Sequence, residues 1–503
     1  MGVRFVIGLA ALCLLVLPAA TRLGAAETTV TVTQGVDADT LDPLKTQVTP
    51  TTNVVLQLFD TLLIHDPGGK LVPSLATSWK RISPNVWEFK LRKDVKFSNG
   101  DPLTSADVKF SVEKIKEPAY KSQQTTFVNG IDRVETPDAY TVRYTTKRPV
   151  PIVPGQPYNV RIVDAKYWLA HGDAYMADHP IGSGPYTLKR WDKDNVMEMD
   201  ARPDYWGGKP PIDHAVFKPI PENASRVAAL KTGETDLITN VPFQYALSIE
   251  GAPNTRMRSV RSVRVLFIAF NTHKPGPQNN KLVRQAINYA VDVPAIIKSV
   301  LGGRAYELAT PIPPGFIGYD PKIPGYAHDV AKAKALLAQA GYPDGKGLDL
   351  VVNAPQGRYN KDKEIAEAVA GQLNAIGIKA TARPQSWQTY FTQISNQLLE
   401  PMYMLGWGNN TYDADFSLAP HFSSEGRFAT WSTPEMDKLI EEARYELDPV
   451  KRQHLYSRIL MTIHEEAPWI FLFQYEDLYA TSKRLVWQPR GDEQIFVTDM
   501  KLR

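Results

Sequence analysis

The feature that most constrains the fold is a regular alternation of helix-patterned and strand-patterned segments in the C-terminal half of the chain. A helix pattern capped by Asp329 precedes the strand pattern of residues 348–352, and a second helix pattern, with Ile365 and Leu373 on one face, precedes that of residues 378–382. Strands that alternate with helices of about 10–15 residues are typical of sheets covered by helices. The sequence therefore predicts α/β domains.

Capping signals and irregular stretches mark the ends of other elements. We expect Thr104 and Asp107 to form the capping box of one helix, and Ser432 and Glu435, on either side of a proline, to form that of another. Residues 41–53 have neither a helical nor a strand period and are expected to be irregular. No repeat and no low-complexity linker divides the 503 residues, so domains joined by several crossings of the chain are favoured.

The first 26 residues differ from the rest of the chain. Arg4 precedes an apolar run over residues 5–17, and small residues at 24–26 follow. This order is typical of a cleavable signal peptide, and the run is shorter than the roughly 20 residues that span a bilayer, so an uncleaved anchor is the lesser alternative. Cys13, the only cysteine, lies inside the run. The mature chain is therefore expected to contain no cysteine, and so neither disulfides nor thiol chemistry; a lipid-modified Cys13 is the lesser alternative.

The sequence contains no pattern that identifies a catalytic or metal centre. Phosphate-loop, nucleophile-elbow and zinc-helix motifs are all missing, so we expect no cofactor and no metal. The formal charge of +3 is spread along the chain, which gives no reason to expect a nucleic acid partner. One enzyme alternative remains open. Asp413 and Asp415 follow the apolar strand pattern that ends at Trp407, and a secreted hydrolase can use two acids beside an aromatic wall.

Six segments in order along the chain resemble one family, the family 5 extracellular solute-binding proteins that serve peptide, nickel and opine ABC importers. The segments are LFDTLLIHDPGGKLVPSLATSWK at 58–80, WEFKLRKDVKFSNGDPLTSADVKFSVEKI at 87–115, PIGSGPYTLKRW at 180–191, ARPDYWGGKPPID at 201–213, LVRQAINYAVD at 282–292, and the helix–strand units from 329 to 378.

The resemblance implies a two-lobed periplasmic-binding-protein fold of the large type II cluster, with an extra subdomain. Residues 27–58, 181–264 and 478–503 would form the core of lobe I, residues 59–180 its inserted subdomain, and residues 265–477 lobe II. The ligand would lie between the lobes, which would close around it by a hinge motion.

The resemblance also implies site residues in the stretch MLGWGNNTYDADF, which starts at Met404. Trp407 would form a cleft wall, and the loop with Asn409, Asn410 and Tyr412 would face the ligand. Peptide-binding relatives place an aspartate for the ligand ammonium at the position of Asn410. An amide supplies no charge, so an ammonium would need Asp413 in its place.

Two further cleft residues are implied by the resemblance. Arg358, beside Tyr359 and Asn360, resembles the arginine that holds the ligand carboxylate, and Trp387 is a second candidate wall residue. The expected protein is a monomeric, non-enzymatic periplasmic carrier. It would capture a short peptide or an amino-acid conjugate and deliver it to permease subunits in the inner membrane, with a receptor-presenting sensor and the hydrolase as alternatives.

Overall fold

The computed structural model describes residues 1–2, 27–67, 70–151 and 160–503. Nearly all of the predicted signal peptide, including Cys13, lies outside the described residues. Within the described parts of the chain, no helix is both long and apolar enough to cross a membrane.

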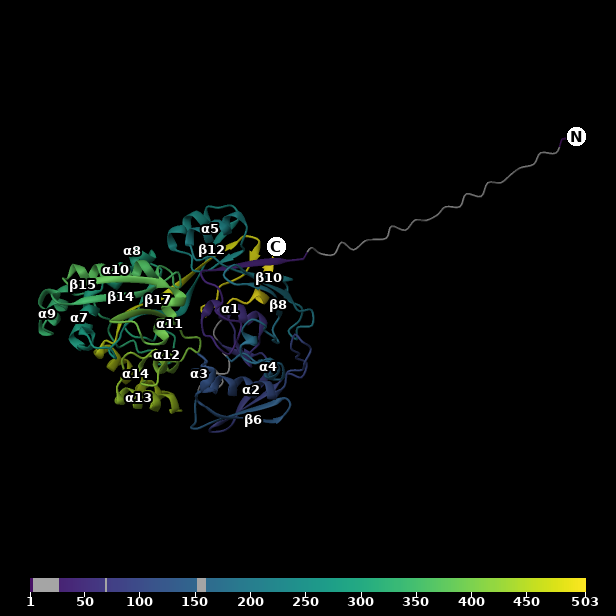
Figure 1. Ribbon diagram of the computed structural model, residues 1–503, viewed down its shortest axis with the longest axis horizontal. Helices are drawn as coiled ribbons and strands as arrows, with labels where there is room; N and C mark the ends of the chain where they lie inside the picture. The colour runs from purple at the N-terminus through teal and green to yellow at the C-terminus, as the bar shows by residue number, and fades with distance from the viewer. Residues whose placement is uncertain (3–26, 68–69, 152–159) are drawn as a thin grey trace.

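One mixed sheet of 11 strands extends through the molecule (Figure 1). Its order is β15-β14-β16-β12-β17-β11-β1-β10-β9-β8, and β13 pairs with β17. The strands are β1 (Thr29–Gln34), β8 (Tyr186–Asp192), β9 (Val196–Ala201), β10 (His214–Pro219), β11 (Leu237–Ile238), β12 (Thr255–Phe270), β13 (Ala305–Glu307), β14 (Asp349–Gln356), β15 (Lys379–Ser386), β16 (Met402–Gly408) and β17 (Trp469–Ser482). Strands β14, β15 and β16 are parallel, as are β1, β10 and β11.

Two long antiparallel strands, β12 and β17, connect the halves of this sheet. At one end β17 pairs with β11, and at the other end β12 pairs with β16 from Arg264 to Phe270. The register between β12 and β17 shifts between Arg261 and Val265. An irregularity of this kind bends a strand, and it lies where the chain passes from one half of the molecule to the other.

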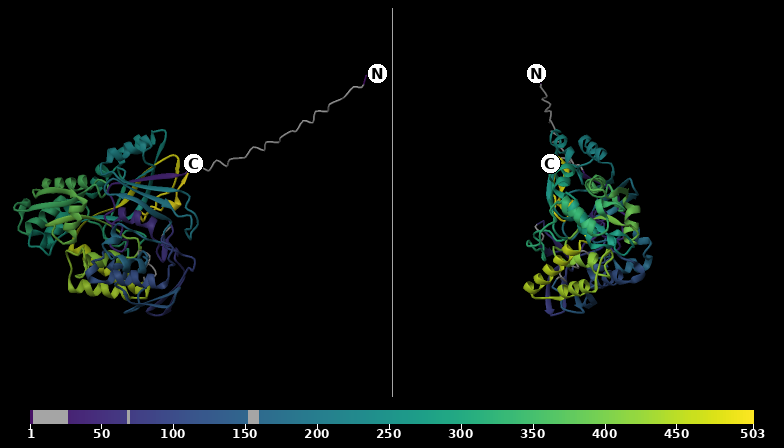
Figure 2. Two further views of the ribbon diagram at one scale, coloured as in Figure 1. Left: turned by 45° about the vertical axis from the view of Figure 1, so that its right-hand side comes forward. Right: turned by 90° about the vertical axis from the view of Figure 1, so that its left-hand side faces the viewer.

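Helices cover both halves of the sheet (Figures 1 and 2). They are α1 (Thr49–Leu58), α2 (Ser105–Lys116), α3 (Thr125–Val128), α4 (Ala165–His171), α5 (Asn223–Thr232), α6 (Ala246–Glu250), α7 (Lys281–Ala290), α8 (Val293–Leu301), α9 (Val330–Gln339), α10 (Asp362–Ala375), α11 (Trp387–Ser395), α12 (Asp415–Phe422), α13 (Pro434–Tyr445) and α14 (Pro449–Glu466). The predicted α/β class is confirmed. In the unit β14–α10–β15, the apolar stripe with Ile365 and Leu373 is fully buried.

A separate sheet of four strands, in the order β4-β5-β7-β6, lies at the end of the blue half in Figure 1. Its strands are β4 (Ala76–Ser83), β5 (Val86–Leu91), β6 (Ile131–Asp138) and β7 (Thr141–Thr146). Two further sheets have two strands each: β2 (Leu63–His65) with β3 (Leu71–Pro73), and β18 (Leu485–Val486) with β19 (Lys501–Leu502). The predicted capping box of α2 is present, because the Asp107 carboxylate accepts a hydrogen bond from the Thr104 backbone N–H at 2.7 Å.

Two local predictions are wrong. The cap of α13 is Thr433, whose hydroxyl accepts from the Met436 N–H at 3.1 Å, so the helix begins one residue later than the Ser432 and Glu435 spacing indicated. Residues 49–53, expected to be irregular, form the first turns of α1. The threonines in this stretch weaken the helical period, but a proline in the first turn and burial of Val54 and Val55 stabilise the helix.

The apolar core consists of several clusters. One includes Val30, Phe89 and Met500, a second includes Ile268 and Val352 around β14 and α10, and a third surrounds β16. The molecule therefore has separate packed bodies connected by β12 and β17. The domain boundaries given above remain a prediction.

Candidate functional site

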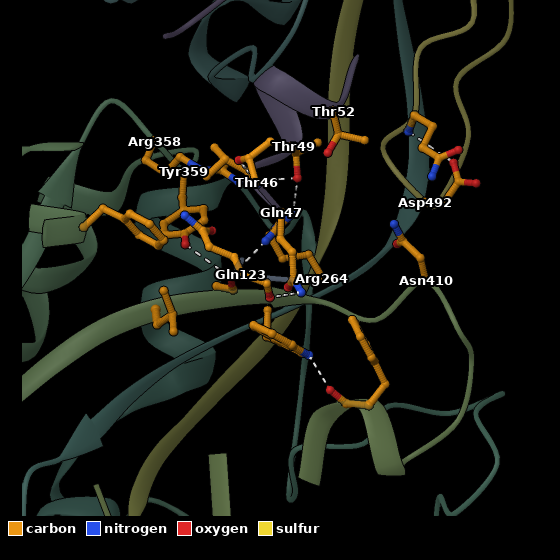
Figure 3. Close-up of a pocket in the computed structure, with 18 of the residues that line it drawn as sticks. Thr46, Gln47, Thr49, Thr52, Gln123, Arg264, Arg358, Tyr359, Asn410 and Asp492 are labelled. Carbon is orange, nitrogen blue, oxygen red and sulfur yellow. Dashed lines mark hydrogen bonds between the residues drawn. The ribbon is translucent and has the colours of Figure 1, made fainter. Parts of the chain in front are cut away.

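A cavity lies where the two halves of the molecule meet, beside β12 and the end of β16 (Figure 3). The space between its walls, including the opening to solvent, is about 910 Å³. One wall consists of residues 46–49, Thr52, Gln123, Phe127, Arg161, Asp492 and Gln494. The other consists of Arg264, Arg358, Tyr359, Trp387, Phe391, residues 405–408, Asn410, Phe416 and Phe428.

Strand β16 supplies Trp407 to the cavity wall. The indole N–H donates to the Phe416 carbonyl at 3.1 Å, and the His421 ring packs against it edge-on at 4.6 Å. Only 9% of Trp407 is exposed. Its apolar face therefore remains available to the cavity, while its one donor is used inside the protein.

The glycines on either side of Trp407 allow other side chains to pack over the strand. A Cβ at Gly406 would lie 2.7 Å from the Tyr359 ring, and a Cβ at Gly408 would lie 3.0 Å from an Arg264 nitrogen. The sequence GWG thus places one large ring in the wall and leaves room for an arginine and a tyrosine beside it.

Arg358 is a buried cation at one end of the cavity. It is 7% exposed, its Nη2 donates one long hydrogen bond to the Thr49 hydroxyl at 3.4 Å, and its Nε–H is buried with no partner. It forms no ion pair with any carboxylate among the described residues. Burial lowers the pKa of this guanidinium, and the like charge of Arg264 lowers it further. Glu493 and Asp362 act in the opposite sense and raise the pKa of Arg358 without forming an ion pair with it, so its charge is only partly compensated.

The backbone of the loop that carries Arg358 is held by the Asp362 carboxylate. This carboxylate accepts the backbone N–H groups of Gly357, Arg358 and Tyr359 at 3.1, 2.9 and 3.0 Å. The guanidinium also lies over two rings, 4.8 Å from the centroid of Tyr359 and 5.3 Å from that of Trp387. Arg358 is therefore held in place without an anionic partner, which is the arrangement that suits an incoming carboxylate.

Arg264, the neighbouring arginine, is fully engaged. It forms an ion pair with Glu493 at 2.5 Å and donates to the Gly406 carbonyl at 2.9 Å and to the Thr49 hydroxyl at 2.8 Å. The Glu493 carboxylate raises the pKa of Arg264 above its ordinary value against the effect of burial. Arg264 thus joins β12, β16, α1 and the C-terminal segment.

The N-terminal end of α1 faces the two arginines. Thr49 and Thr52 line the cavity, and the residue that precedes the helix, Val48, lies in the wall as well. The N-terminus of a helix carries a partial positive charge. This end of the cavity therefore favours an anion for two separate reasons.

The opposite end of the cavity carries one amide and one carboxylate side chain (Figure 3). Asn410 and Asp492 lie there, away from Arg358 and Tyr359. The Asn410 amide oxygen is buried and has no hydrogen-bond partner. The Asp492 carboxylate is held by Arg490 at 2.6 and 3.0 Å, and it accepts the Gln494 backbone N–H at 3.1 Å.

A smaller cavity of about 320 Å³ lies behind the arginines, with Arg264, Arg358 and Tyr359 shared between the two cavities. Asp477 lines it and has one buried oxygen without a partner. Burial and the neighbouring Glu493 carboxylate raise the pKa of Asp477 well above its ordinary value. No ion pair joins Asp477 to Arg358 among the described residues, so Asp477 is not a direct anionic partner of this guanidinium.

The structure places the expected site residues in two groups. Trp407, Asn410, Arg358 and Trp387 line the cavity together, whereas Asn409, Tyr412 and Asp413 do not. The Asn409 amide donates to the Asp413 carbonyl at 2.8 Å and to the Ser417 hydroxyl at 2.9 Å, and thereby shapes the loop.

Tyr412 has a left-handed backbone, with φ of 56°. Its ring packs against His65 at 5.9 Å and Phe316 at 5.1 Å. It therefore forms a contact between the two halves of the molecule, outside the cavity.

The two candidate hydrolase carboxylates are both bound by arginines. Asp413 forms a two-point ion pair with Arg452 at 2.5 and 2.9 Å and accepts the Tyr456 hydroxyl at 2.9 Å. Asp415 pairs with Arg444 at 3.0 Å. Both carboxylates are buried away from the cavity, where they anchor the loop after β16 to helices α13 and α14. Asp413 therefore does not take the place of the ammonium-binding aspartate that relatives have at the position of Asn410.

Several cavity residues were not predicted individually. Arg161, Gln123 and Asp492 lie far apart in the sequence, and no local pattern distinguishes them, whereas Arg264 had one signal. The available signal was charge in an apolar run, since Arg264 interrupts a segment of buried β12 residues. In the described parts of the chain, no cluster of three histidine, cysteine or acidic residues could hold a metal ion.

Comparison with solved structures identifies the class. The ABC transporter-associated periplasmic binding protein DppA of Helicobacter pylori, in complex with the peptide STSA, is 26% identical; the match covers 94% of this chain and 98% of that one with a TM-score of 0.85. The binding protein AgaA of A. tumefaciens R10, in complex with agropinic acid, is 28% identical, with coverages of 94% and 99% and a TM-score of 0.84. The fold and the cavity therefore define a two-lobed periplasmic binding protein, as the sequence predicted.

Sequence comparison gives the family. The profile of the bacterial extracellular solute-binding proteins, family 5, matches residues 70–429. The glutathione-binding protein GsiB of Escherichia coli O157:H7 is 28% identical over 471 residues, which cover 91% of each chain. The protein belongs to the family 5 bacterial extracellular solute-binding proteins, and the resemblance drawn from its motifs is confirmed.

Proposed function

We propose that this protein is the periplasmic substrate-binding component of an ABC importer. It captures a short peptide, a peptide-like compound or an amino-acid conjugate between two lobes and delivers it to permease subunits in the inner membrane. The single observation that carries the choice of ligand is the buried Arg358 guanidinium, which lines the cavity without an anionic partner among the described residues. A ligand carboxylate supplies that partner through two parallel hydrogen bonds.

The proposal assigns residues 27–58, 181–264 and 478–503 to the core of lobe I, residues 59–180 to its subdomain and residues 265–477 to lobe II. The cavity supports this division, because Thr49 and Gln123 come from one set and Trp387 and Trp407 from the other, while Arg264, the last residue of the first set, lies at the boundary and pairs with β16. Phe127 and Phe416 also stack across the same boundary at 5.1 Å. A ligand that contacts both walls favours the closed arrangement by its differential affinity.

The relatives support a non-enzymatic role. The similar proteins include a glutathione-binding protein and binding proteins in complex with the peptide STSA and with agropinic acid. We further propose that the mature protein starts after residue 26, has no cofactor and acts as a monomer. The hydrolase alternative is disfavoured because Asp413 and Asp415 are bound in ion pairs by Arg452 and Arg444, away from the cavity.

The test is to identify the solute that copurifies with the mature protein from its native periplasm by gentle unfolding and mass spectrometry. The recovered solute, added to the ligand-free protein, should raise the melting temperature with the logarithm of its concentration and reduce the radius of gyration. It should be recovered chemically unchanged. Conversion of the solute, or binding without Arg358 dependence, would contradict the proposal.

A further inference from the structure

More positively charged than negatively charged residues line the cavity. Among the described lining residues, Arg264 and Arg358 lie on one wall and the carboxylate Asp492 on the other, whereas Arg161 is already engaged with other residues of the protein. A buried excess of positive charge is unfavourable unless something of opposite sign compensates it. The ion pairs of these residues therefore indicate which charge a ligand must supply.

Two of these charges are already neutralised by residues outside the cavity. Arg264 is paired with Glu493 at 2.5 Å, and Asp492 is paired with Arg490 at 2.6 Å. Neither pair has a net charge to offer to a ligand. Arg358 has no such pair, and the α1 N-terminus beside it adds to the positive potential.

The other end of the cavity offers a hydrogen-bond acceptor without a negative charge. The Asn410 amide oxygen is buried and unpartnered, so it requires one donor from a ligand or water. A neutral N–H or O–H group satisfies it at little cost. A primary ammonium would lose its hydration and meet a neutral amide on one side and an aspartate already bound by arginine on the other.

We infer that the ligand carries more acidic groups than ammonium groups, and that an uncharged N–H or O–H donor contacts Asn410. The chemical class is an acid whose amino group is blocked, such as an N-acylated amino acid or peptide, with its carboxylate at Arg358. This inference rests on the proposed function and narrows its range of solutes.

The experiment compares matched ligands that differ only at the amino end. A panel of glycyl dipeptides and the N-acetyl form of each is tested by thermal shift and calorimetry, at about pH 7, where a free amino terminus is largely charged. The proteins are the wild type, Asn410→Asp, and Asn254→Asp as the matched control. Asn254 lies in an exposed loop outside the cavity, so its substitution adds the same charge elsewhere.

The wild type should bind the acetylated member of a pair about tenfold or more tightly, and Asn410→Asp should shift this ratio about tenfold toward the free dipeptide. Asn254→Asp should leave the ratio unchanged. Tighter binding of free dipeptides by the wild type, an unchanged ratio in Asn410→Asp, or no binding of any acetylated compound would overturn the inference. If Asn410→Asp does not fold, the wild-type ratio alone decides.

Failure of the inference is distinguishable from failure of the proposed function. Tight, reversible binding of free dipeptides would leave a carrier with a different ligand class. A native solute that is chemically converted, or no native solute together with no binding in either series, would reject the carrier as well. The net charge of the copurified solute, read from its mass and composition, provides an independent second measurement.

Discussion

Replacement of Arg358 by alanine should affect ligand binding and ligand-free stability very differently. In the ligand-free protein the guanidinium is buried, lacks an ion pair and donates only one long hydrogen bond. Its removal eliminates a buried charge that is only partly compensated, which offsets the loss of its contacts with the Tyr359 and Trp387 rings, each worth about 0.5–2 kcal/mol. We expect the unfolding free energy of Arg358→Ala to stay within about 1 kcal/mol of the wild type.

The ligand complex should respond strongly to the same substitution. Loss of one partner of a buried, hydrogen-bonded charge pair costs about 2–5 kcal/mol, which corresponds to roughly 30-fold to 5000-fold in Kd. Calorimetry with the copurified solute measures this change, and urea unfolding of the ligand-free proteins measures the stability.

Arg264→Ala is the internal comparison, because Arg264 lies beside Arg358 but forms an ion pair with Glu493, whereas Arg358 forms none among the described residues. Removal of Arg264 leaves the buried Glu493 without its partner and should reduce the unfolding free energy by about 3–5 kcal/mol. The reasoning would be refuted if Arg358→Ala destabilised the ligand-free protein as strongly as Arg264→Ala, or if it left the Kd unchanged.

Three further substitutions test other parts of the description. Asp413→Asn should lower the unfolding free energy by about 3–5 kcal/mol, because it breaks the buried pair with Arg452, and should change Kd less than about threefold. Burial lowers the pKa of His421 to about 3, below its unfolded value of 6.5, so this residue lowers stability as the pH falls through 6.5. Between about pH 7 and pH 5, His421 should account for about 2 kcal/mol of the loss in unfolding free energy, and His421→Phe should remove this contribution. Trp387→Ala, which removes a cavity wall beside Arg358, should weaken binding about five- to tenfold.

Denaturant unfolding at two pH values and calorimetry at one pH provide these measurements. A large loss of affinity in Asp413→Asn would restore this residue to the site. An unchanged pH dependence in His421→Phe would mean that other groups account for the acid sensitivity, and unaltered binding by Trp387→Ala would place that indole in the core alone.

Much of the fold was predictable because its signals are local. The unit β14–α10–β15 follows directly from the spacing of Ile365 and Leu373 and from the strand patterns on either side. Helix α1 was not predicted, because its threonine-rich first turns have low helical preference and are stabilised by tertiary burial. The C-terminal part of β17, which ends at Ser482, carries no clear strand pattern, because its polar residues are buried by pairing with distant strands.

The site was less predictable than the fold, because it is assembled from segments up to several hundred residues apart. Trp407 and Arg358 could be proposed from motifs that resemble relatives, and both line the cavity. Asp492 has no sequence signal of its own, and only the structure shows that Arg490 neutralises it. The spacing of Asp413 and Asp415 gave no indication that arginines from later helices bind both of them.

The residues that line the cavity differ in how much of the fold depends on them, and Arg264 is the one that supports most of it. This side chain fastens four segments at the point where the register of β12 shifts, so its replacement would disturb the chain crossing along with the binding surface. Asn410 and Arg358 support much less of the surrounding architecture. Retargeting of this scaffold toward new solutes, by divergence or by engineering of a biosensor, should therefore proceed through these two positions and leave Arg264 intact.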